Sequence, residues 1–223
     1  MKRNLITTAD GSHSIQVPAL NVAYHSIHGA IQESLHVFIR AGFYGIEEQQ
    51  SLRIFEVGLG TALNALLTLI EAEKTKTKVY YETIEPEPLH PDEVKSLNYC
   101  QQLNRPDLQP IFERLHSCDW EKEILITGYF TLLKRKENLL TFKQPQPFNV
   151  VYFDAFAPNA QPELWTKEVF DKMYSLLRQG GILVTYCSKG DVRRNMIAAG
   201  FEVEKLPGPP KKREMIRARK PIP

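Results

Sequence analysis

A glycine-containing turn between a predicted strand and a predicted helix constrains this chain more than any other feature. The segment Glu56-Val-Gly-Leu-Gly-Thr61 joins an apolar run at 52–57 to an alanine- and leucine-rich run at 62–72, which is typical of a helix. Such a turn needs glycine where the backbone adopts positive φ or approaches a ligand closely. Gly58 and Gly60 therefore predict a nucleotide-type cofactor site, and an ordinary glycine-rich turn is the alternative. The third glycine of the dinucleotide fingerprint is missing, which favours a ligand without pyrophosphate.

An acidic residue follows the next predicted strand. The segment Lys78-Val-Tyr-Tyr-Glu-Thr-Ile-Glu85 is rich in β-branched and aromatic residues, which favour a strand, and Pro86 ends it. Glu85 lies about as far beyond the glycines as the ribose-binding acid of nucleotide-binding folds, so we expect its carboxylate to accept hydrogen bonds from ribose hydroxyls. A solvated strand end is the alternative. The order of strand, G-x-G, helix, strand and acid favours the cofactor contact.

Length and composition indicate one soluble domain. The chain has 223 residues, of which 43% are hydrophobic and 24% are charged, and its net charge is +2. We expect a lead-in at residues 1–50 that covers the cofactor end and an α/β domain at residues 51–223. No apolar run approaches the roughly 20 residues of a membrane span, and the N-terminus lacks the apolar core of a signal peptide, so a cytoplasmic protein is expected. Three scattered cysteines and six histidines without a ligand pattern predict no metal site.

Strands and helices alternate from residue 52 onward, which predicts an α/β fold with a mostly parallel sheet. Strands are expected at 52–57, 78–84, 148–154 and 182–187, and helices at 61–74, 166–177 and 190–199. Gly180-Gly181 is expected to close the helix at 166–177. Two final strands, at 201–206 and 213–218, are joined by so short a link that they must form an antiparallel hairpin.

Two segments give weaker patterns. Residues 21–39 carry apolar side chains at helical spacing, which predicts a helix in the lead-in. Residues 128–142 alternate weakly between apolar and polar. This alternation indicates either a β-hairpin with residues 134–138 between its arms or a strand that follows a β-arm.

Asp154 ends the buried strand, at the sheet edge where open α/β sheets bind their ligands. This position predicts a chemical role, and capping of the proline-rich turn that follows is the alternative. Trp165 either stacks on a base or anchors the loop in the core. A basic set near the C-terminus either contacts phosphates or forms a solvated chain end. The C-terminal run holds Lys211, Lys212, Arg213, Arg217, Arg219 and Lys220, and the candidates for phosphate contacts are Lys211, Lys212 and Arg213, with Arg193 and Arg194 nearby in sequence.

The strand order, the E-x-G-x-G-T turn and the acid after the second strand resemble the class I S-adenosylmethionine-dependent methyltransferases. Three further segments point to a narrower family within this class. These segments are Asp154-Ala-Phe-Ala-Pro-Asn-Ala-Gln-Pro-Glu-Leu-Trp165, residues 180–194 and Gly208-Pro-Pro-Lys-Lys-Arg-Glu-Met215. Together with Tyr24-His-Ser26 and parts of residues 29–38, they look like signature segments of the methyltransferase half of the bifunctional tRNA-modification enzymes that make 5-methylaminomethyl-2-thiouridine.

The resemblance implies that the chain takes a methyl group from S-adenosylmethionine and places it on the 5-aminomethyl group of the wobble uridine in tRNA. Bifunctional members continue into a flavin-dependent oxidase, whereas this chain ends at Pro223. The resemblance therefore implies a stand-alone methyltransferase whose substrate comes from a separate enzyme. Asp154 would be the catalytic residue: it would orient the attacking amine and steady the ammonium that forms, and whether it also removes a proton is open.

The resemblance also implies the other site residues. Cofactor contacts are expected from Glu56, Gly58, Gly60, Thr61, Asn64, Glu85, Asn138, Leu139, Asp154 and Ala155. Contacts to tRNA are expected from Tyr24, Phe156, Pro158, Trp165, Arg193, Arg194, Lys211, Lys212 and Arg213. The adenine contact, often an acidic residue in this family, falls to Asn138, with Glu137 as the competitor. Two alternatives stay open: a methyltransferase or aminopropyltransferase for a small amine, and a catalytically silent tRNA-binding module.

Overall fold

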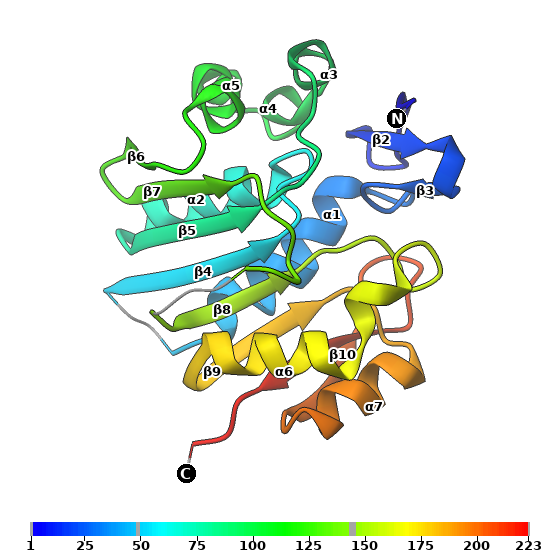
Figure 1. The fold of residues 1–223 in the computed structure, drawn as a ribbon. Helices are drawn as coiled ribbons and strands as arrows, with labels where there is room; N and C mark the ends of the chain where they lie inside the picture. The colour runs from blue at the N-terminus through cyan, green and yellow to red at the C-terminus, as the bar shows by residue number, and fades with distance from the viewer. Residues whose placement is uncertain (1, 48–49, 143–145, 223) are drawn as a thin grey trace.

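The computed structural model describes residues 2–47, 50–142 and 146–222, which contain one eight-stranded sheet (Figure 1). Its strands are β4 Ser51–Val57, β5 Lys78–Ile84, β6 Glu123–Thr127, β7 Phe130–Arg135, β8 Phe148–Phe153, β9 Leu177–Thr185, β10 Glu202–Pro207 and β11 Glu214–Arg219. They lie in the order β10-β11-β9-β8-β4-β5-β7-β6. The strands from β9 to β7 in this order run parallel, and antiparallel pairs close both edges. The predicted α/β sheet with a terminal antiparallel hairpin is confirmed.

Two apolar cores cover the two faces of the sheet, because neighbouring residues of a strand point to opposite faces. In β4, Ile54 packs in the core that includes α2 (Leu63–Thr75), and Phe55 packs in the core that includes α6 (Lys167–Leu176). Figure 1 shows α6 in front of the sheet and α2 behind it. β8 lies between β4 and β9 and is buried along its length, as its nearly continuous apolar sequence predicts.

The predicted helices at 61–74, 166–177 and 190–199 are present as α2, α6 and α7 (Gly190–Ala198). Thr166 caps α6, since its Oγ1 accepts a hydrogen bond from Val169 N at 3.4 Å. The prediction that Gly180-Gly181 closes this helix is wrong. α6 ends at Leu176 and the chain passes directly into β9, where Gly180 has φ +73° and the pairing register with β8 shifts. The two glycines therefore accommodate an irregularity inside a strand.

Short helices and a hairpin connect β5 to β8. The helices are α3 Pro91–Lys95, α4 Tyr99–Gln102, η4 Pro106–Leu108 and α5 Gln109–Ser117. The hairpin is formed by β6 and β7, and its turn lies at residues 128–129. The prediction that residues 134–138 lie between two arms is therefore wrong, and the alternative of a strand that follows a β-arm describes β7. Residues 136–140 leave β7 at the carboxyl edge of the sheet, because β7 runs parallel to β5.

The lead-in begins with strands that were not predicted. A three-stranded antiparallel sheet is formed by β1 Asn4–Thr7, β2 His13–Val17 and β3 Val22–Ala23, and the short turn η1 Pro18–Leu20 joins β2 to β3. A second short turn, η3 Phe43–Gly45, lies at the end of the lead-in before β4. The helix predicted over 21–39 begins only at Ala30, as α1 Ala30–Ser34, and continues as a π-helical turn, η2 Leu35–Arg40. Gly29 precedes α1 with φ +141°, and Asp10 Oδ2 accepts a hydrogen bond from Gln32 N at 3.0 Å. A contact from the turn between β1 and β2 therefore starts the helix.

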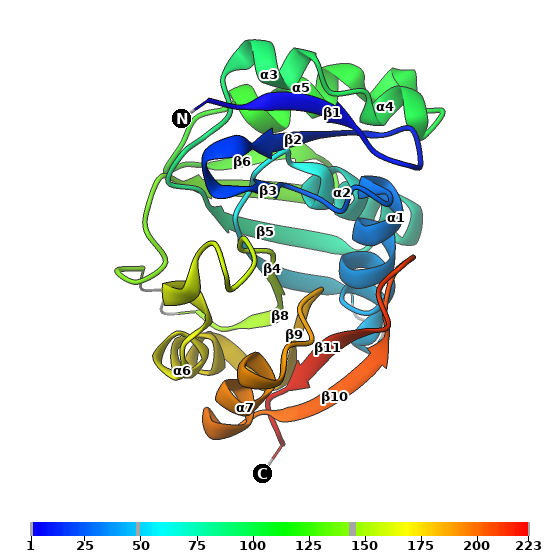
Figure 2. The same ribbon diagram turned by 90° about the vertical axis from the view of Figure 1, so that its right-hand side faces the viewer.

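The small sheet lies at the carboxyl edge of the parallel strands, beside α3 and α4 (Figures 1 and 2). The backbone N–H of His13 donates to Asn98 Oδ1 at 2.8 Å, and Asn98 Nδ2 donates to Gly11 O at 3.0 Å. No helix among the described residues is long and apolar enough to cross a membrane. The same residues contain no group of three or more His, Cys, Asp or Glu side chains that could hold a metal ion.

Candidate functional site

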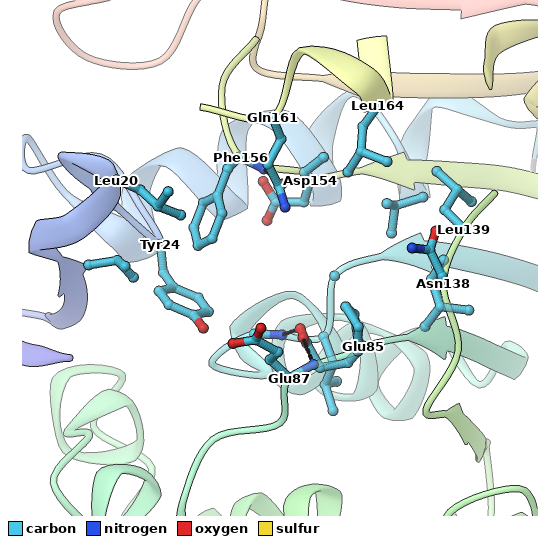
Figure 3. A pocket seen from close by; sticks show the side chains of 18 of the residues that line it. Leu20, Tyr24, Glu85, Glu87, Asn138, Leu139, Asp154, Phe156, Gln161 and Leu164 are labelled. Atoms are coloured by element: carbon cyan, nitrogen blue, oxygen red, sulfur yellow. Dashed lines mark hydrogen bonds between the residues drawn. The ribbon is translucent and has the colours of Figure 1, made fainter. Parts of the chain in front are cut away.

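A cavity of about 210 Å³ opens where the parallel strands end (Figure 3). Its walls come from the lead-in and from residues that follow β4, β5, β7 and β8. The chain continues from β4 to β5 on one side, whereas β8 lies on the other side of β4, so the strand order reverses there. Open α/β sheets bind ligands at this switch point. The predicted site residues that line the cavity are Tyr24, Gly58, Gly60, Thr61, Glu85, Asn138, Leu139, Asp154, Ala155 and Phe156.

The turn after β4 requires both of its glycines. Gly58 has φ +89° and Gly60 has φ +49°, in a region that other residues rarely adopt. A Cβ on Gly60 would lie 2.8 Å from Tyr24 Cδ1, so a larger residue would displace the Tyr24 ring. The turn therefore keeps its backbone accessible from the cavity, with an aromatic ring packed directly against it.

Glu85 follows β5 in the cavity wall, with 8% of its surface exposed. Its Oε2 accepts a hydrogen bond from Gly60 N at 3.0 Å, and its Oε1 accepts one from Glu87 N at 2.9 Å (Figure 3). Burial raises the pKa of this carboxyl, and the two backbone donors oppose the rise. A carboxylate has about four acceptor positions, so about two remain for the hydroxyl groups of a ligand.

Asn64 joins two carboxyl groups, that of Asp154 in the cavity wall and that of Glu56 behind it. Its Nδ2 donates to Glu56 Oε1 at 3.0 Å and to Asp154 Oδ2 at 2.8 Å. Burial raises the pKa of Glu56 to about 8, and the bond from Asn64 opposes the rise. Burial also raises the pKa of Asp154 well above its usual range, and the negative charges of Glu33 and Glu56 add to this. Glu56 and Asn64 do not line the cavity, so the geometry gives them a supporting position behind Asp154.

Asn138 and Leu139 form the wall of the cavity that lies across from the aromatic side chains (Figure 3). Asn138 Oδ1 accepts a hydrogen bond from Leu140 N at 2.9 Å, which fixes the orientation of the amide. Glu137, the competing candidate for an adenine contact, does not line the cavity. The geometry therefore favours Asn138 over Glu137 for a ligand contact.

Two aromatic rings form the wall beside Asp154. Tyr24 and Phe156 meet edge to face, with their ring centroids 5.1 Å apart. Burial raises the pKa of Tyr24 to about 12, and the charge of Glu85 adds to this, so the phenol keeps its proton near pH 7. Tyr24 comes from the lead-in and Phe156 from the loop after β8. This wall therefore exists only when the lead-in is docked on the sheet edge.

Trp165 lies behind the aromatic wall. It is 3% exposed, its Nε1 donates to Phe156 O at 2.8 Å, and its ring contacts those of Phe153 and Tyr186. The indole therefore anchors the loop after β8 in the core, which was the alternative to stacking on a base. Pro158 is half-buried in the same loop and lies outside the cavity lining.

Lys212 is turned toward the protein, unlike its exposed neighbours Lys211 and Arg213. Its Nζ pairs with Glu33, a residue of α1 that is 5% exposed, and lies 4.3 Å from the ring centroid of Tyr186. This ion pair joins the loop between β10 and β11 to the lead-in. The charge of Lys212 also opposes the rise in the pKa of Asp154. The Lys212 ammonium group is therefore engaged in a contact within the protein.

The other basic residues lie outside the cavity lining. Lys211 and Arg213 are exposed in the loop between β10 and β11. Arg194 is exposed and paired with Asp191, and Arg193 is half-buried. Within this set, Lys211 and Arg213 are the residues best placed to meet a phosphate backbone.

Arg3 and Gln161 line the cavity and were not predicted as site residues. Arg3 Nη2 donates to Glu87 O at 2.7 Å, and Arg3 Nη1 pairs with Glu93 at 3.2 Å, so the N-terminal strand is tied to the rim of the cavity. Both partners lie more than 80 positions away along the chain. No local pattern in the sequence records such a contact. Gln161 lies in the segment that carries the family resemblance, which was the available signal for it.

Two histidines that were not assigned to the site hold Thr61. His25 Nε2 lies 2.6 Å from Thr61 Oγ1, and His116 Nε2 donates to Thr61 O at 3.2 Å. Burial lowers the pKa of each imidazole to about 4, so both are neutral near pH 7. The end of the glycine turn is therefore fixed by residues 36 and 55 positions away.

Known proteins resemble this chain over nearly its whole length. A family model described as S-adenosyl-L-methionine-dependent methyltransferase matches residues 128–221. The tRNA 5-methylaminomethyl-2-thiouridine biosynthesis bifunctional proteins MnmC of Methylobacillus flagellatus and Pseudomonas entomophila are each 30% identical to it, over 88% and 86% of this chain. These alignments cover 32% and 31% of the two relatives, so the chain spans about a third of their length.

A solved structure shows the same fold. The crystal structure of MNMC2 from Aquifex aeolicus has a TM-score of 0.80 and 24% sequence identity, and the match covers 100% of this chain and 72% of that chain. The sheet order and the cavity at its switch point agree with the class I methyltransferase fold, whose ligand is S-adenosyl-L-methionine. Residues 128–221 therefore match the S-adenosyl-L-methionine-dependent methyltransferase family model, and the chain as a whole is similar to about a third of the length of the MnmC proteins and has the fold of MNMC2.

Proposed function

We propose that this chain transfers the methyl group of S-adenosyl-L-methionine to the 5-aminomethyl group of the wobble uridine in tRNA. The product would be 5-methylaminomethyluridine or its 2-thio form. The observation that carries the proposal is a single cavity that brings the glycine turn and Glu85 together with Asp154. The name of the bifunctional relatives, which refers to 5-methylaminomethyl-2-thiouridine biosynthesis, supports the choice of acceptor.

The donor end of the cavity, formed by Gly58, Gly60, Glu85, Asn138 and Leu139, fits S-adenosyl-L-methionine. The free acceptor positions of Glu85 suit ribose hydroxyls. Asn138 Oδ1 is engaged by Leu140 N, so the Asn138 amide would present its NH₂ group as a donor to an acceptor nitrogen of adenine. The two glycines leave space that a Cβ would reduce. Bound there, the cofactor supplies the methyl group, its sulfur keeps the electron pair of the broken C–S bond, and the acceptor nitrogen gains the methyl group and loses a proton.

The acceptor end, formed by Tyr24, Asp154, Phe156 and Gln161, holds the chemistry that the chain itself contributes. Asp154 would accept a hydrogen bond from the amine and orient its lone pair, and orientation of bound reactants is a large source of rate. Because burial raises its pKa, the Asp154 carboxylate is a stronger base than an exposed aspartate. It is therefore suited to take the proton that the nitrogen loses. Asn64 positions the carboxylate for both tasks.

Recognition of tRNA would combine one base in the acceptor end with contacts to the backbone outside it. Tyr24 and Phe156 offer aromatic surface beside Asp154, and anticodon bases leave their stack at small cost. Lys211 and Arg213 are exposed and would contact phosphates. A separate enzyme would supply the aminomethyl group. We expect a cytoplasmic location, where tRNA is modified.

The direct test is incubation of the purified protein with labelled S-adenosyl-L-methionine and tRNA that carries 5-aminomethyluridine, followed by nucleoside mass spectrometry. We expect that nucleoside to gain one methyl group. A protein that binds the cofactor but leaves the nucleoside unchanged would contradict the proposed acceptor. A parallel reaction with small primary amines tests the second candidate, which the inward position of Lys212 favours because it reduces the exposed positive charge.

A further inference from the structure

Gln161 lies in the acceptor end with a fixed side-chain orientation. Its Oε1 accepts a hydrogen bond from Phe156 N at 3.2 Å, and its own backbone N–H donates to Ala157 O at 3.1 Å. A backbone N–H can pair only with an acceptor, so the oxygen of the Gln161 amide must face Phe156. The amide NH₂ group must then point the other way. This assignment follows from hydrogen-bond chemistry, which is how the two ends of an amide are told apart.

The loop that carries Gln161 is held on several sides. Trp165 Nε1 donates to Phe156 O at 2.8 Å, and Asn195 Nδ2 from α7 donates to Trp165 O at 2.9 Å. At the start of the loop, Tyr186 Oη donates to Ala155 O at 2.8 Å. These bonds tie the loop to α7 and to the residue that follows β9. Gln161 is therefore presented by a rigid frame, as a group that selects a ligand must be.

The amide nitrogen of Gln161 is directed into the cavity. Figure 3 shows the side chain beside Asp154 and Phe156, pointing into the open space. Within residues 2–47, 50–142 and 146–222, no hydrogen bond from this nitrogen to the protein is formed. Its two N–H donors therefore favour a ligand with an acceptor atom at that place.

The proposed substrate has such an acceptor. In 5-aminomethyluridine the aminomethyl group is on ring carbon C5, and the neighbouring ring carbon C4 carries a carbonyl oxygen. If Asp154 holds the amine, as the proposed function requires, a donor beside Asp154 faces this carbonyl. Cytosine carries an amino group at the same position, which would place donor against donor.

We propose that Gln161 determines base specificity: its side-chain NH₂ donates to the C4 carbonyl of the target uracil and disfavours cytosine. This inference rests on the proposed function and adds a residue and a base preference to it. Asp154 and Gln161 would then read two neighbouring substituents of one ring, one as acceptor and one as donor. Both contacts are made to the base alone, so neither depends on the remainder of the tRNA.

The test compares synthetic anticodon stem-loops that carry 5-aminomethyluridine or 5-aminomethylcytidine at the wobble position. Gln161→Glu keeps an oxygen that can accept from Phe156 N–H and replaces the NH₂ group with a second oxygen. We expect the wild-type ratio of kcat/KM for uridine over cytidine to fall about 10-fold or more in this variant, the size of one lost contact to a base edge. The affinity for S-adenosyl-L-methionine should stay within about twofold, because Gln161 lies at the acceptor end.

Gln161→Met, which removes both polar groups at similar volume, provides a second measure of the ratio. Each ratio is measured in one preparation, so a partly unfolded variant does not distort it. Ratios within about twofold of wild type in both variants would overturn the role of Gln161 while leaving the proposed function intact. A wild-type protein that binds the cofactor but methylates neither stem-loop would overturn the proposed function, and the role of Gln161 with it.

Discussion

The donor end and the acceptor end of the cavity are built from different kinds of structure. The donor end consists of residues that follow β4, β5 and β7, whose relative positions are set by continuous parallel pairing, from Ser51–Lys78 to Val57–Ile84 in the first pair of strands. The acceptor end combines Tyr24 from the lead-in with the loop after β8. The sheet therefore fixes the donor end, whereas side-chain contacts between distant segments fix the acceptor end.

The two ends also hold their carboxylates differently. Glu85 at the donor end accepts hydrogen bonds from two backbone N–H groups, whereas Asp154 at the acceptor end accepts one from the Asn64 side chain. Backbone donors stabilise an ionised carboxylate that binds, and a buried carboxylate with a raised pKa is suited to accept a proton. Changes at the donor end should therefore alter cofactor affinity, and changes at the acceptor end should alter turnover.

The largest effect is expected from Asp154→Asn. Asparagine keeps an oxygen for the bond from Asn64 but removes the charge and the basic group. Turnover should fall by about 10²- to 10⁴-fold, the usual contribution of a positioned acid or base. Single-turnover methylation of tRNA with 5-aminomethyluridine measures this loss. Turnover within about tenfold of wild type would contradict the assigned role of Asp154.

Glu56→Gln should change the pH dependence of stability. Burial raises the pKa of Glu56 from 4.5 to about 8, so the folded state binds more protons than the unfolded state between these values. The stabilising contribution is complete below pH 4.5 and is lost as the pH rises through about 8. Glutamine does not titrate, so the variant should lack a fall in unfolding free energy on the order of 5 kcal/mol.

Denaturant unfolding of wild type and Glu56→Gln at several pH values between the two pKa values measures this difference. The comparison is between slopes, so other titrating groups cancel when they are the same in both proteins. Equal pH slopes would show that Glu56 is not the buried, protonated partner of Asn64 at the back of the acceptor end.

Glu85→Ala should weaken binding of S-adenosyl-L-methionine by about 10- to 100-fold, because ribose hydroxyls lose their charged acceptor. Isothermal titration calorimetry measures the affinity. Glu87→Gln is the matched control, since Glu87 is an exposed carboxylate at the same rim. Equal affinity in Glu85→Ala and wild type, or an equal loss in the control, would remove Glu85 from the donor end.

The smallest effect is expected from Lys211→Ala combined with Arg213→Ala. Two lost phosphate contacts should lower tRNA affinity several-fold at low salt and reduce the slope of log affinity against log salt by about 1 to 2. Lys205→Ala is the control, because Lys205 lies on the neighbouring strand and pairs with Glu214. A similar loss in the control would place the tRNA contacts elsewhere on the surface.

The sequence was more informative about the donor end than about the acceptor end, and the reason is local. Gly58, Gly60 and Glu85 lie on one strand–turn–helix–strand segment, so spacing alone places them on one edge of a parallel sheet. Trp165 and Lys212 were predicted as tRNA contacts from their residue types. In the structure, Trp165 is buried and holds the loop after β8 in the core. The partner of Lys212, Glu33, lies 179 positions away, and no local pattern records that pairing.

The measurement that tests the division of the cavity most directly is a double-mutant cycle of Asp154→Asn and Glu85→Ala. Cofactor affinity and single-turnover rate at saturating cofactor are measured in all four proteins. We predict that Glu85→Ala accounts for nearly all the loss of affinity, that Asp154→Asn accounts for nearly all the loss of rate, and that the two changes add within about 0.5 kcal/mol. A loss of cofactor affinity in Asp154→Asn as large as in Glu85→Ala, or strong coupling between them, would contradict separate donor and acceptor ends.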